Sequence, residues 1–312
     1  MENKRVLIVL AVVLAISCVI VAATLFSVKW NIGHIPGKSI DDLVELLEND
    51  NIYIDRGIIS AKRERGMVYV FDSDGYNNTV AVLLTGSRVK NTFVIPDGEM
   101  IVLENGDTVK FGRSFTFAYQ KQGADTFRPN IVELRQYASP CTEDSVPETA
   151  AAVRKFLEKG SSEFDSRKMK ISMSIDGIWE QDGRYYLLCS RNIDGVGITG
   201  NLVLCTVEND IVTSAYGTWC FFTSGSSYSA QLTDILNILF NVKKDLRVSD
   251  SGDDGDNAGS ITVQGIEHCY SLYFMENEES FCLIPCWQIV TDMDVELIYN
   301  AIDGTLYTKN KG

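Results

Sequence analysis

Residues 147–159, PETAAAVRKFLEK, and the runs that follow them decide the fold. A proline at the first position and Gly160 directly after the last are typical of the two ends of a helix. Short apolar runs typical of strands come next, at 176–178, 184–191, 201–207 and 211–216. A helix followed by several such strands predicts one helix packed across an antiparallel sheet.

The same order of elements recurs in the last third of the chain. Residues 229–244 predict a second helix, with Leu232 and Leu239 on one side. Strand-like runs follow it at 264–266, 281–289, 296–301 and 305–308. Two short units that share an interface bury more core than either one alone. We therefore predict an α+β protein in which the helix-plus-antiparallel-sheet units 147–223 and 228–312 are repeats.

An N-terminal α+β region, 39–140, precedes these units. We expect Ser39 to open an amphipathic helix with Asp42 as its capping-box partner, and the helix to end at 49–51. Strands are predicted at 52–54, 67–71, 79–84, 100–103, 108–111 and 115–119. The proline-containing segment 127–146 is expected to be a connection.

Residues 6–28 are 23 consecutive residues without a charge. As a helix rising ~1.5 Å per residue they would span ~34 Å, enough to cross a hydrocarbon core of ~30 Å. A cleaved signal peptide is the alternative, although its apolar region would be shorter, ~7–15 residues. We therefore predict a cytoplasmic tail, 1–5, a transmembrane helix and a linker, 29–38. Lys4 and Arg5 favour a cytoplasmic N-terminus, with the rest of the chain outside.

The charge and the residue types limit the classes of function. The chain has 312 residues, with 42 acidic and 28 basic side chains and a net charge of −14. Because an acidic surface repels phosphates, nucleic acid is excluded as a general partner. Two histidines and no recognisable catalytic motif predict that the protein is not an enzyme and uses no cofactor.

Each group that could carry chemistry has a structural explanation. His268 is next to Cys269, and neighbours on a strand point to opposite faces. Ser87-x-x-Lys90 lacks the companion motifs of a penicillin-reacting site. The acidic run 250–256 does not fit a calcium-binding loop, because Gly252 occupies a ligand position. We therefore predict no catalytic, cofactor-binding or metal site.

The cysteines are expected to be mostly buried thiols. Seven of the eight lie outside the apolar segment 6–28, an odd number that does not suit a complete disulfide framework. Cys282 and Cys286 are four residues apart on a predicted strand, too far apart to bond each other. Cys189 and Cys205 could lie opposite each other on paired strands, where we favour two buried thiols over a bond.

The C-terminal runs 283–289, LIPCWQI, and 299–304, YNAIDG, resemble a known pattern. The YycH/YycI group and PepSY-like or cystatin-like modules have a Pro-x-Trp strand followed by a Tyr-x-Asn-Ala hairpin. Here the residue between tyrosine and asparagine is missing. In this resemblance Trp287 is a core anchor on a strand, and Asp303-Gly304 is the tight turn that returns the chain.

The resemblance implies a regulator rather than an enzyme. It implies a single-pass protein of the bacterial cell membrane, with a cytoplasmic N-terminus and an extracytoplasmic domain in the cell envelope. Such a protein would bind and modulate a two-component sensor histidine kinase through its transmembrane helix and outer domain, with a paralogous anchored regulator as a further partner. The alternative is a PepSY-like envelope module that binds a peptide, a protease or a cell-wall ligand without a kinase.

Overall fold

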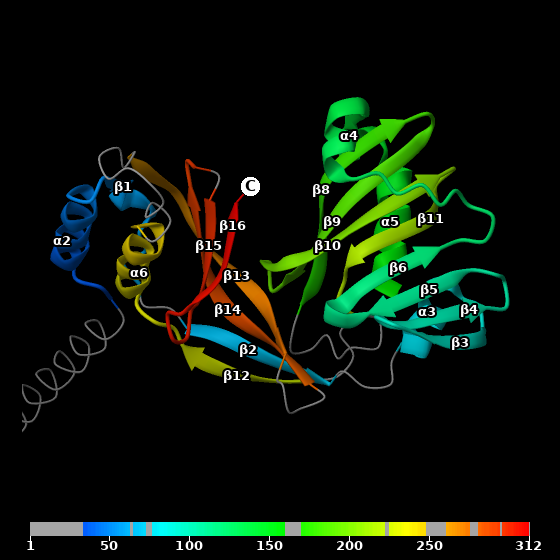
Figure 1. The fold of residues 1–312 in the computed structure, drawn as a ribbon, viewed down its shortest axis with the longest axis horizontal. Helices are drawn as coiled ribbons and strands as arrows, with labels where there is room; N and C mark the ends of the chain where they lie inside the picture. The colour runs from blue at the N-terminus through cyan, green and yellow to red at the C-terminus, as the bar shows by residue number, and fades with distance from the viewer. Residues whose placement is uncertain are drawn as a thin grey trace, which may run out of the picture. The chain divides into compact units, whose positions relative to one another are not determined.

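The computed structural model describes residues 34–62, 65–72, 77–159, 170–221, 225–247, 260–274, 280–293 and 295–311. These residues form five α-helices and sixteen strands, and hydrogen bonds connect the strands into one mixed sheet. The chain forms two compact units, each built from segments that are separate in the sequence. Figure 1 labels the elements of both.

The predicted fold class and localisation are wrong and are corrected here. The predicted transmembrane segment 6–28 lies outside the described residues, and none of the helices within them is long and apolar enough to cross a bilayer. A large mixed sheet, with parallel pairs between β1 and β13 and between β10 and β13, replaces the predicted series of small antiparallel units. The prediction of a single-pass envelope protein is therefore not retained.

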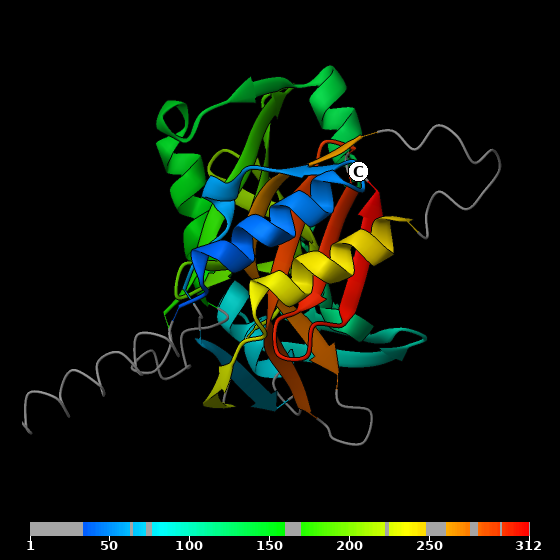
Figure 2. The ribbon, with the colours of Figure 1, turned by 90° about the vertical axis from the view of Figure 1, so that its left-hand side faces the viewer.

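The first unit joins the early helix to the C-terminal strands. Its elements are α2 (Gly37–Glu48), β1 (Ile52–Ile54), α6 (Ile235–Arg247), parts of β13 (Ile261–Phe274) and β14 (Ser280–Thr291), β15 (Val295–Asn300) and β16 (Leu306–Lys311). Strands β14, β15 and β16 are antiparallel neighbours. Figures 1 and 2 show α2 and α6 lying side by side across one face of these strands.

The family-like residues lie in the core of this unit. Trp287 is directly opposite Tyr299 on the paired strands β14 and β15, and both are buried. The hydroxyl of Tyr299 donates to Oδ2 of Asp245 on α6 at 2.9 Å, which ties the strand to the helix. Gly304, at φ 78°, makes the turn into β16. The predicted core anchor and turn are confirmed.

The second unit contains a longer antiparallel sheet. Its elements are β2 (Arg65–Asp72), α3 (Asn77–Thr85), β3 (Val89–Ile95), β4 (Gly98–Leu103), β5 (Thr108–Gly112), β6 (Thr116–Gln120), α4 (Ile131–Tyr137), β7 (Ser139–Cys141), α5 (Pro147–Lys159), β8 (Ile171–Gln181), β9 (Arg184–Ile193), β10 (Val196–Glu208) and β11 (Ile211–Thr218), with the start of β12 (Gly225–Gln231). The strand order β10-β11-β6-β5-β4-β3 ends at β3.

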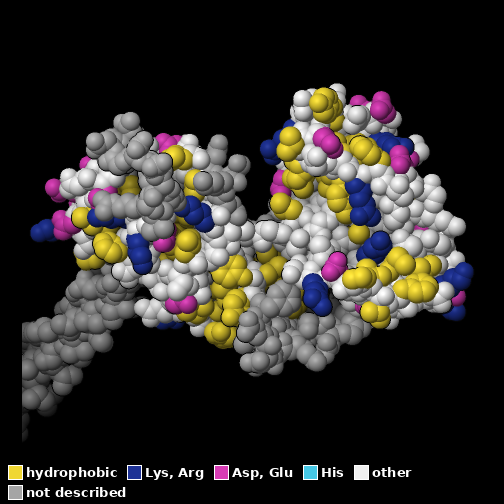
Figure 3. Space-filling view, in the orientation of Figure 1, with side chains coloured by type: hydrophobic (Ala, Val, Ile, Leu, Met, Phe, Trp, Pro, Cys, Tyr) yellow, Lys and Arg dark blue, Asp and Glu magenta, His cyan; other side chains and the backbone are white. Residues whose placement is uncertain are grey.

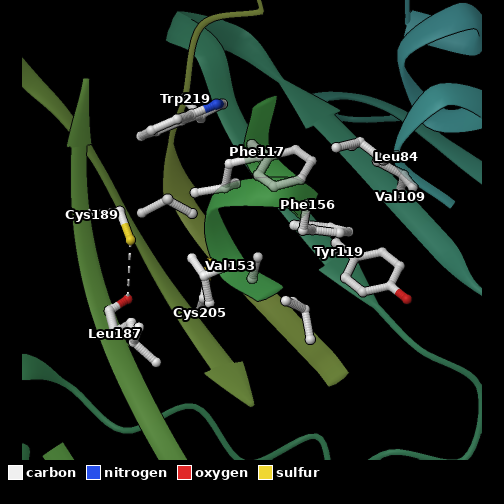
Figure 4. Packing of buried hydrophobic residues seen from close by; sticks show 14 of the residues in the cluster. Leu84, Val109, Phe117, Tyr119, Val153, Phe156, Leu187, Cys189, Cys205 and Trp219 are labelled. Carbon is white, nitrogen blue, oxygen red and sulfur yellow. Dashed lines mark hydrogen bonds between the residues drawn. The ribbon is translucent and has the colours of Figure 1, made fainter. Parts of the chain in front are cut away.

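Helices cover the two faces of this sheet unequally. Val153 and Phe156 of α5 pack on the inner face against Phe117, Tyr119 and other buried side chains, as Figure 4 shows. The opposite, outer face carries a smaller cluster in which α4 contributes Leu134. That cluster includes no residue of β3 to β6. We place the candidate site on the outer face of these four strands.

Several predicted elements are wrong, each for a physical reason. The predicted strand 79–84 is helix α3, because Val80, Ala81 and Leu84 are spaced to bury one helical side against the sheet. The predicted connection 127–146 contains α4, whose capping box joins Asn130 and Glu133.

The predicted starts of the early helix and of the second repeat's helix also differ from the structure. No side chain caps α2, which begins at Gly37 after Pro36, so the predicted capping box is wrong. The second predicted helix begins only at Ile235, because residues 225–231 form strand β12. The helix predicted at 147–159 is confirmed.

The units do not follow chain order. Within the predicted region 39–140, α2 and β1 belong to the first unit, whereas β3 to β6 belong to the second. Helix α5 is followed by β8 to β11, and α6 by β13 to β16. That the segments 147–223 and 228–312 are related as repeats stays a prediction.

Candidate binding surface

Strand β3 is an open sheet edge. Among the described strands it pairs only with β4. The register shifts between Val89 and Asn91, and Pro96 follows the last residue, so the regular pairing covers Asn91–Ile95. These five residues carry no charge. An outer strand of this kind presents unpaired backbone N–H and C=O groups, onto which another strand can add.

Both faces of this edge present apolar side chains. Val94 is 92% exposed and Phe93 is 46% exposed. Thr92 donates from Oγ1 to Oδ1 of Asn78 on α3 at 3.3 Å, so the side chains of Thr92 and Val94 point to the inner face. Phe93 therefore points to the outer face. An added strand would meet an apolar side chain on each face.

Phe93 is the first residue of a row of side chains that crosses the outer face from β3 to β11. Phe93 is opposite Met100, Met100 is opposite Lys110, Lys110 is opposite Ala118, and Ala118 is opposite Tyr216. We call these five residues the outer row. Because strands lie ~4.8 Å apart, the row extends ~19 Å from the sheet edge to Tyr216.

Small residues beside the outer row leave a groove. Its volume is about 490 Å³, and Ile95, Lys110, Ala118, Arg128, Tyr216 and Thr218 are among the residues that line it. Ala118 provides a low floor between the longer side chains of Lys110 and Tyr216. The groove therefore begins beside the last residue of the open edge and continues across β5, β6 and β11.

Arg128 is held in place at the far end of the groove. Its guanidinium lies 5.2 Å from the centre of the Tyr216 ring, a cation–π contact. The Tyr216 hydroxyl donates to the carbonyl oxygen of Pro129, next to Arg128 in the chain. Burial raises the pKa of Tyr216 to about 12, against the opposing effect of Arg128. Tyr216 is therefore neutral at physiological pH and keeps its donor.

The two cations of the groove have no acidic partner within the part of the chain that the structure describes. Neither Lys110 nor Arg128 forms an ion pair there. In contrast, Arg184 lies 2.7 Å from Asp125 and 2.9 Å from Glu208. Figure 3 shows Lys and Arg side chains over the middle of this face, beside a hydrophobic patch over β4 and β5.

The cysteine pair predicted on adjacent strands lies in the core. Cys189 on β9 is opposite Val203, and Cys205 on β10 is opposite Leu187, so the two cysteines are diagonal neighbours. Both are buried free thiols, as predicted (Figure 4). A hydrogen bond with Cys205, together with burial, raises the pKa of Cys189 well above its usual value. A thiol in this state is a poor nucleophile.

The other residues considered from the sequence lie apart from one another. Cys282 and Cys286 are buried on β14, and His268 is next to the buried Cys269 on β13. Ser87 accepts a hydrogen bond from the backbone N–H of Asn105 through Oγ at 3.2 Å, a loop contact.

His34 and the acidic loop complete the set. His34, within the predicted linker 29–38, forms an isolated antiparallel β-bridge with Lys62. The acidic run 250–256 lies outside the described residues, within which no group of three His, Cys, Asp or Glu side chains is placed to hold a metal.

The outer row and its open edge are not among the features predicted from the sequence. One signal was readable, since 89–95, VKNTFVI, is rich in strand-forming residues and lies between Gly86 and the turn 96–98. The row itself depends on the pairing of β6 with β11, which are far apart in the chain. No local pattern specifies that pairing.

The comparisons with known proteins provide little constraint. No family model matches the chain. No curated protein matches it. A crystal structure of an uncharacterized protein from Eubacterium rectale is similar to it, with 11% identity over 83% of this chain and 91% of that one and a TM-score of 0.48. None of these comparisons supports a role in two-component signalling, and the resemblance to the YycH/YycI group rests on the sequence motif alone.

Proposed function

We propose that the protein is a non-catalytic regulator that binds a partner protein at the open edge and outer row of the second unit. The observation that carries this proposal is the uncharged stretch Asn91–Ile95 of the outer strand β3, with Val94 92% exposed at an edge that pairs on one side only. Soluble proteins commonly protect such edges with charges or a covering loop. An edge left open in this way suits strand addition by a partner.

Strand addition would combine two kinds of contact. Each backbone hydrogen bond formed with Asn91–Ile95 contributes roughly 0.5–1.5 kcal/mol net of water. Alternate side chains of the added strand would contact Phe93 on the outer face and Val94 on the inner face. The pairing therefore supplies affinity, and the side chains supply selectivity.

Binding at this edge can regulate a partner without chemistry. A ligand that binds one conformation of a partner better than another shifts the population by its difference in affinity. The partner suggested by the resemblance of 283–289 and 299–304 is a sensor histidine kinase, with a paralogous regulator as a further partner. This part of the proposal rests on the sequence motif.

A second candidate function uses the same edge. The protein would bind an extended peptide, or a protease through such a segment, without a kinase. The exposed strand that pairs on one side only favours this function as much as the first, because peptides bind other domains by strand addition at such edges.

Site-specific crosslinking tests the proposal. A photo-crosslinking residue replaces Val94 in the full chain, and a matched control replaces Val132, which is 71% exposed on α4. We expect a specific adduct from position 94, identified by mass spectrometry, and none from position 132. A histidine kinase in the adduct supports the first reading, and a peptide or protease supports the second. Adducts from 132 alone would contradict docking at β3, and turnover in a broad hydrolase screen would overturn the non-catalytic assignment.

A further inference from the structure

We propose that the groove beside β3 recognises the carboxylate groups of an acidic, extended protein segment, through Lys110 and Arg128. The inference deepens the proposed function and rests on it, because the partner segment that pairs with β3 would turn past Ile95 and continue through the groove across the outer face, at right angles to the strands. The occupant is a protein segment that carries aspartate or glutamate side chains where it crosses the outer row.

The spacing of the two cations suits such a segment. Lys110 and Tyr216 are two strands apart in the outer row, with Ala118 between them, so their backbones are ~10 Å apart. Arg128 lies over Tyr216. Alternate residues of an extended segment lie ~6.7 Å apart on one face. The long Lys110 and Arg128 side chains can therefore reach two carboxylates at alternate positions.

Arg128 is prepared for this contact. The ring of Tyr216 supports one face of the guanidinium, and the tyrosine is itself tied to Pro129. A guanidinium held on one face keeps its N–H edges for a carboxylate, which it binds through two parallel hydrogen bonds. Less side-chain entropy is lost on binding than for an unsupported arginine.

Charge complementarity favours an anionic occupant. The chain carries a net charge of −14, yet the groove contains two cations without a described acidic partner. The exposed Asp97 also lines the groove, next to the end of β3. It repels a carboxylate at that end, so the acidic residues of the segment would lie toward Arg128 and Lys110.

The experiment measures binding of two probe peptides to the full chain by fluorescence anisotropy at low salt. One labelled peptide alternates valine and glutamate, and the other has glutamine in place of every glutamate. We expect the glutamate peptide to bind about tenfold more tightly, and the difference to shrink at high salt. Lys110→Gln and Arg128→Gln should each remove a large part of it, with Arg128→Lys intermediate. Lys155→Gln, on α5 at the opposite face, is the matched control.

The outcomes separate this inference from the proposed function. If both peptides bind equally and Val94→Lys weakens both, docking at β3 stands and the carboxylate assignment is wrong. If neither peptide binds, the carboxylate assignment is also wrong, and crosslinking at position 94 judges the edge alone. If inorganic phosphate displaces the glutamate peptide and acetate at equal ionic strength does not, the groove recognises phosphate groups and the carboxylate assignment is wrong. A dimer that the glutamate peptide dissociates would identify the occupant as a second copy.

Discussion

Strands β3 and β16 are both outermost strands, and their sequences treat the exposed edge in opposite ways. Among the described strands, β16 pairs only with β15, as β3 does with β4. The sequence of β16, LYTKNK, has lysines at 309 and 311, and Nζ of Lys309 donates to the carbonyl oxygen of Asp245 at 3.2 Å. Strand β3 has one lysine, Lys90, at its register shift, and its regularly paired residues 91–95 have no charge.

The lack of charge at the open edge is therefore specific to residues 91–95 of β3 and is not a general feature of the outer strands. Lysines on an outer strand oppose pairing with another chain, because pairing would bring their charges out of water. Lysines lie within the paired part of β16, whereas the lysine of β3 precedes its regular pairing and Val94 is 92% exposed within it. A protein that only needed to stay monomeric would be expected to protect both edges.

The largest effect is expected from breaking the hairpin that holds β3. Gly98 follows Asp97 in the β3–β4 turn at φ 150°, and a Cβ there would lie 2.0 Å from the carbonyl oxygen of Phe111. Gly98→Ala should therefore lower the free energy of unfolding by about 3 kcal/mol.

Urea denaturation would measure this loss, with Gly86→Ala as the control. Gly86 also has a positive φ, 71°, but nothing lies within 4 Å of its added Cβ, so strain alone should cost about 1 kcal/mol. Equal losses in the two variants would show that β3 is not held by a close backbone approach at Gly98.

The next effect concerns the protected edge. Tyr299→Phe removes the hydroxyl that donates to Asp245 on α6, behind β15 and β16. We expect a loss of about 1–2 kcal/mol in the free energy of unfolding, because a partly buried carboxylate loses a donor. Tyr53→Phe, at a tyrosine that is 43% exposed on β1, should change it by less than about 0.5 kcal/mol. A neutral Tyr299→Phe would mean that this contact does not stabilise the first unit.

Sequence reasoning identified elements whose signals are local. The helix 147–159 and the strand 184–191 are present as predicted, since proline, glycine and alternation act within a few residues. The β-branched residues of Thr79–Leu84 favour a strand, but packing of Val80 and Leu84 on the sheet overrides that propensity.

The candidate site was not predictable in the same way. The outer row joins Phe93 to Tyr216 through four strand pairings, and only the hairpin pairings of β3, β4, β5 and β6 are local. The pairing of β6 with β11 is set by tertiary packing. The uncharged run 91–95 was readable, but its position at an edge was not.

A smaller effect is expected at alkaline pH, at Tyr216, the last residue of the outer row. The pKa of Tyr216 is raised to about 12, against about 10 in an unfolded chain. Its contribution to stability is therefore fully present below pH ~10 and is lost as the pH rises toward ~12. Because the ring is only partly buried, we expect about 1 kcal/mol.

Denaturation of the wild type and of Tyr216→Phe across that pH range would measure the contribution. The variant should lose less stability than the wild type between pH ~10 and ~12. Buried Tyr119 shifts in the same direction and contributes to both proteins, so only the difference between them reports on Tyr216. Parallel curves would show that burial in the fold does not raise the pKa of Tyr216.

The smallest effect on stability is expected when a lysine is introduced on β3 or removed from β16. These two substitutions test the comparison of the edges most directly. Val94→Lys should change the free energy of unfolding by less than about 0.5 kcal/mol, because the side chain is 92% exposed. It should nevertheless slow aggregation during mild heating, measured by light scattering, since it protects β3 as lysines protect β16. Lys309→Val should act in the opposite direction. If Lys309→Val leaves aggregation unchanged while Val94→Lys slows it, β16 is protected by its geometry rather than by charge, and the difference between the two edges lies in their backbones.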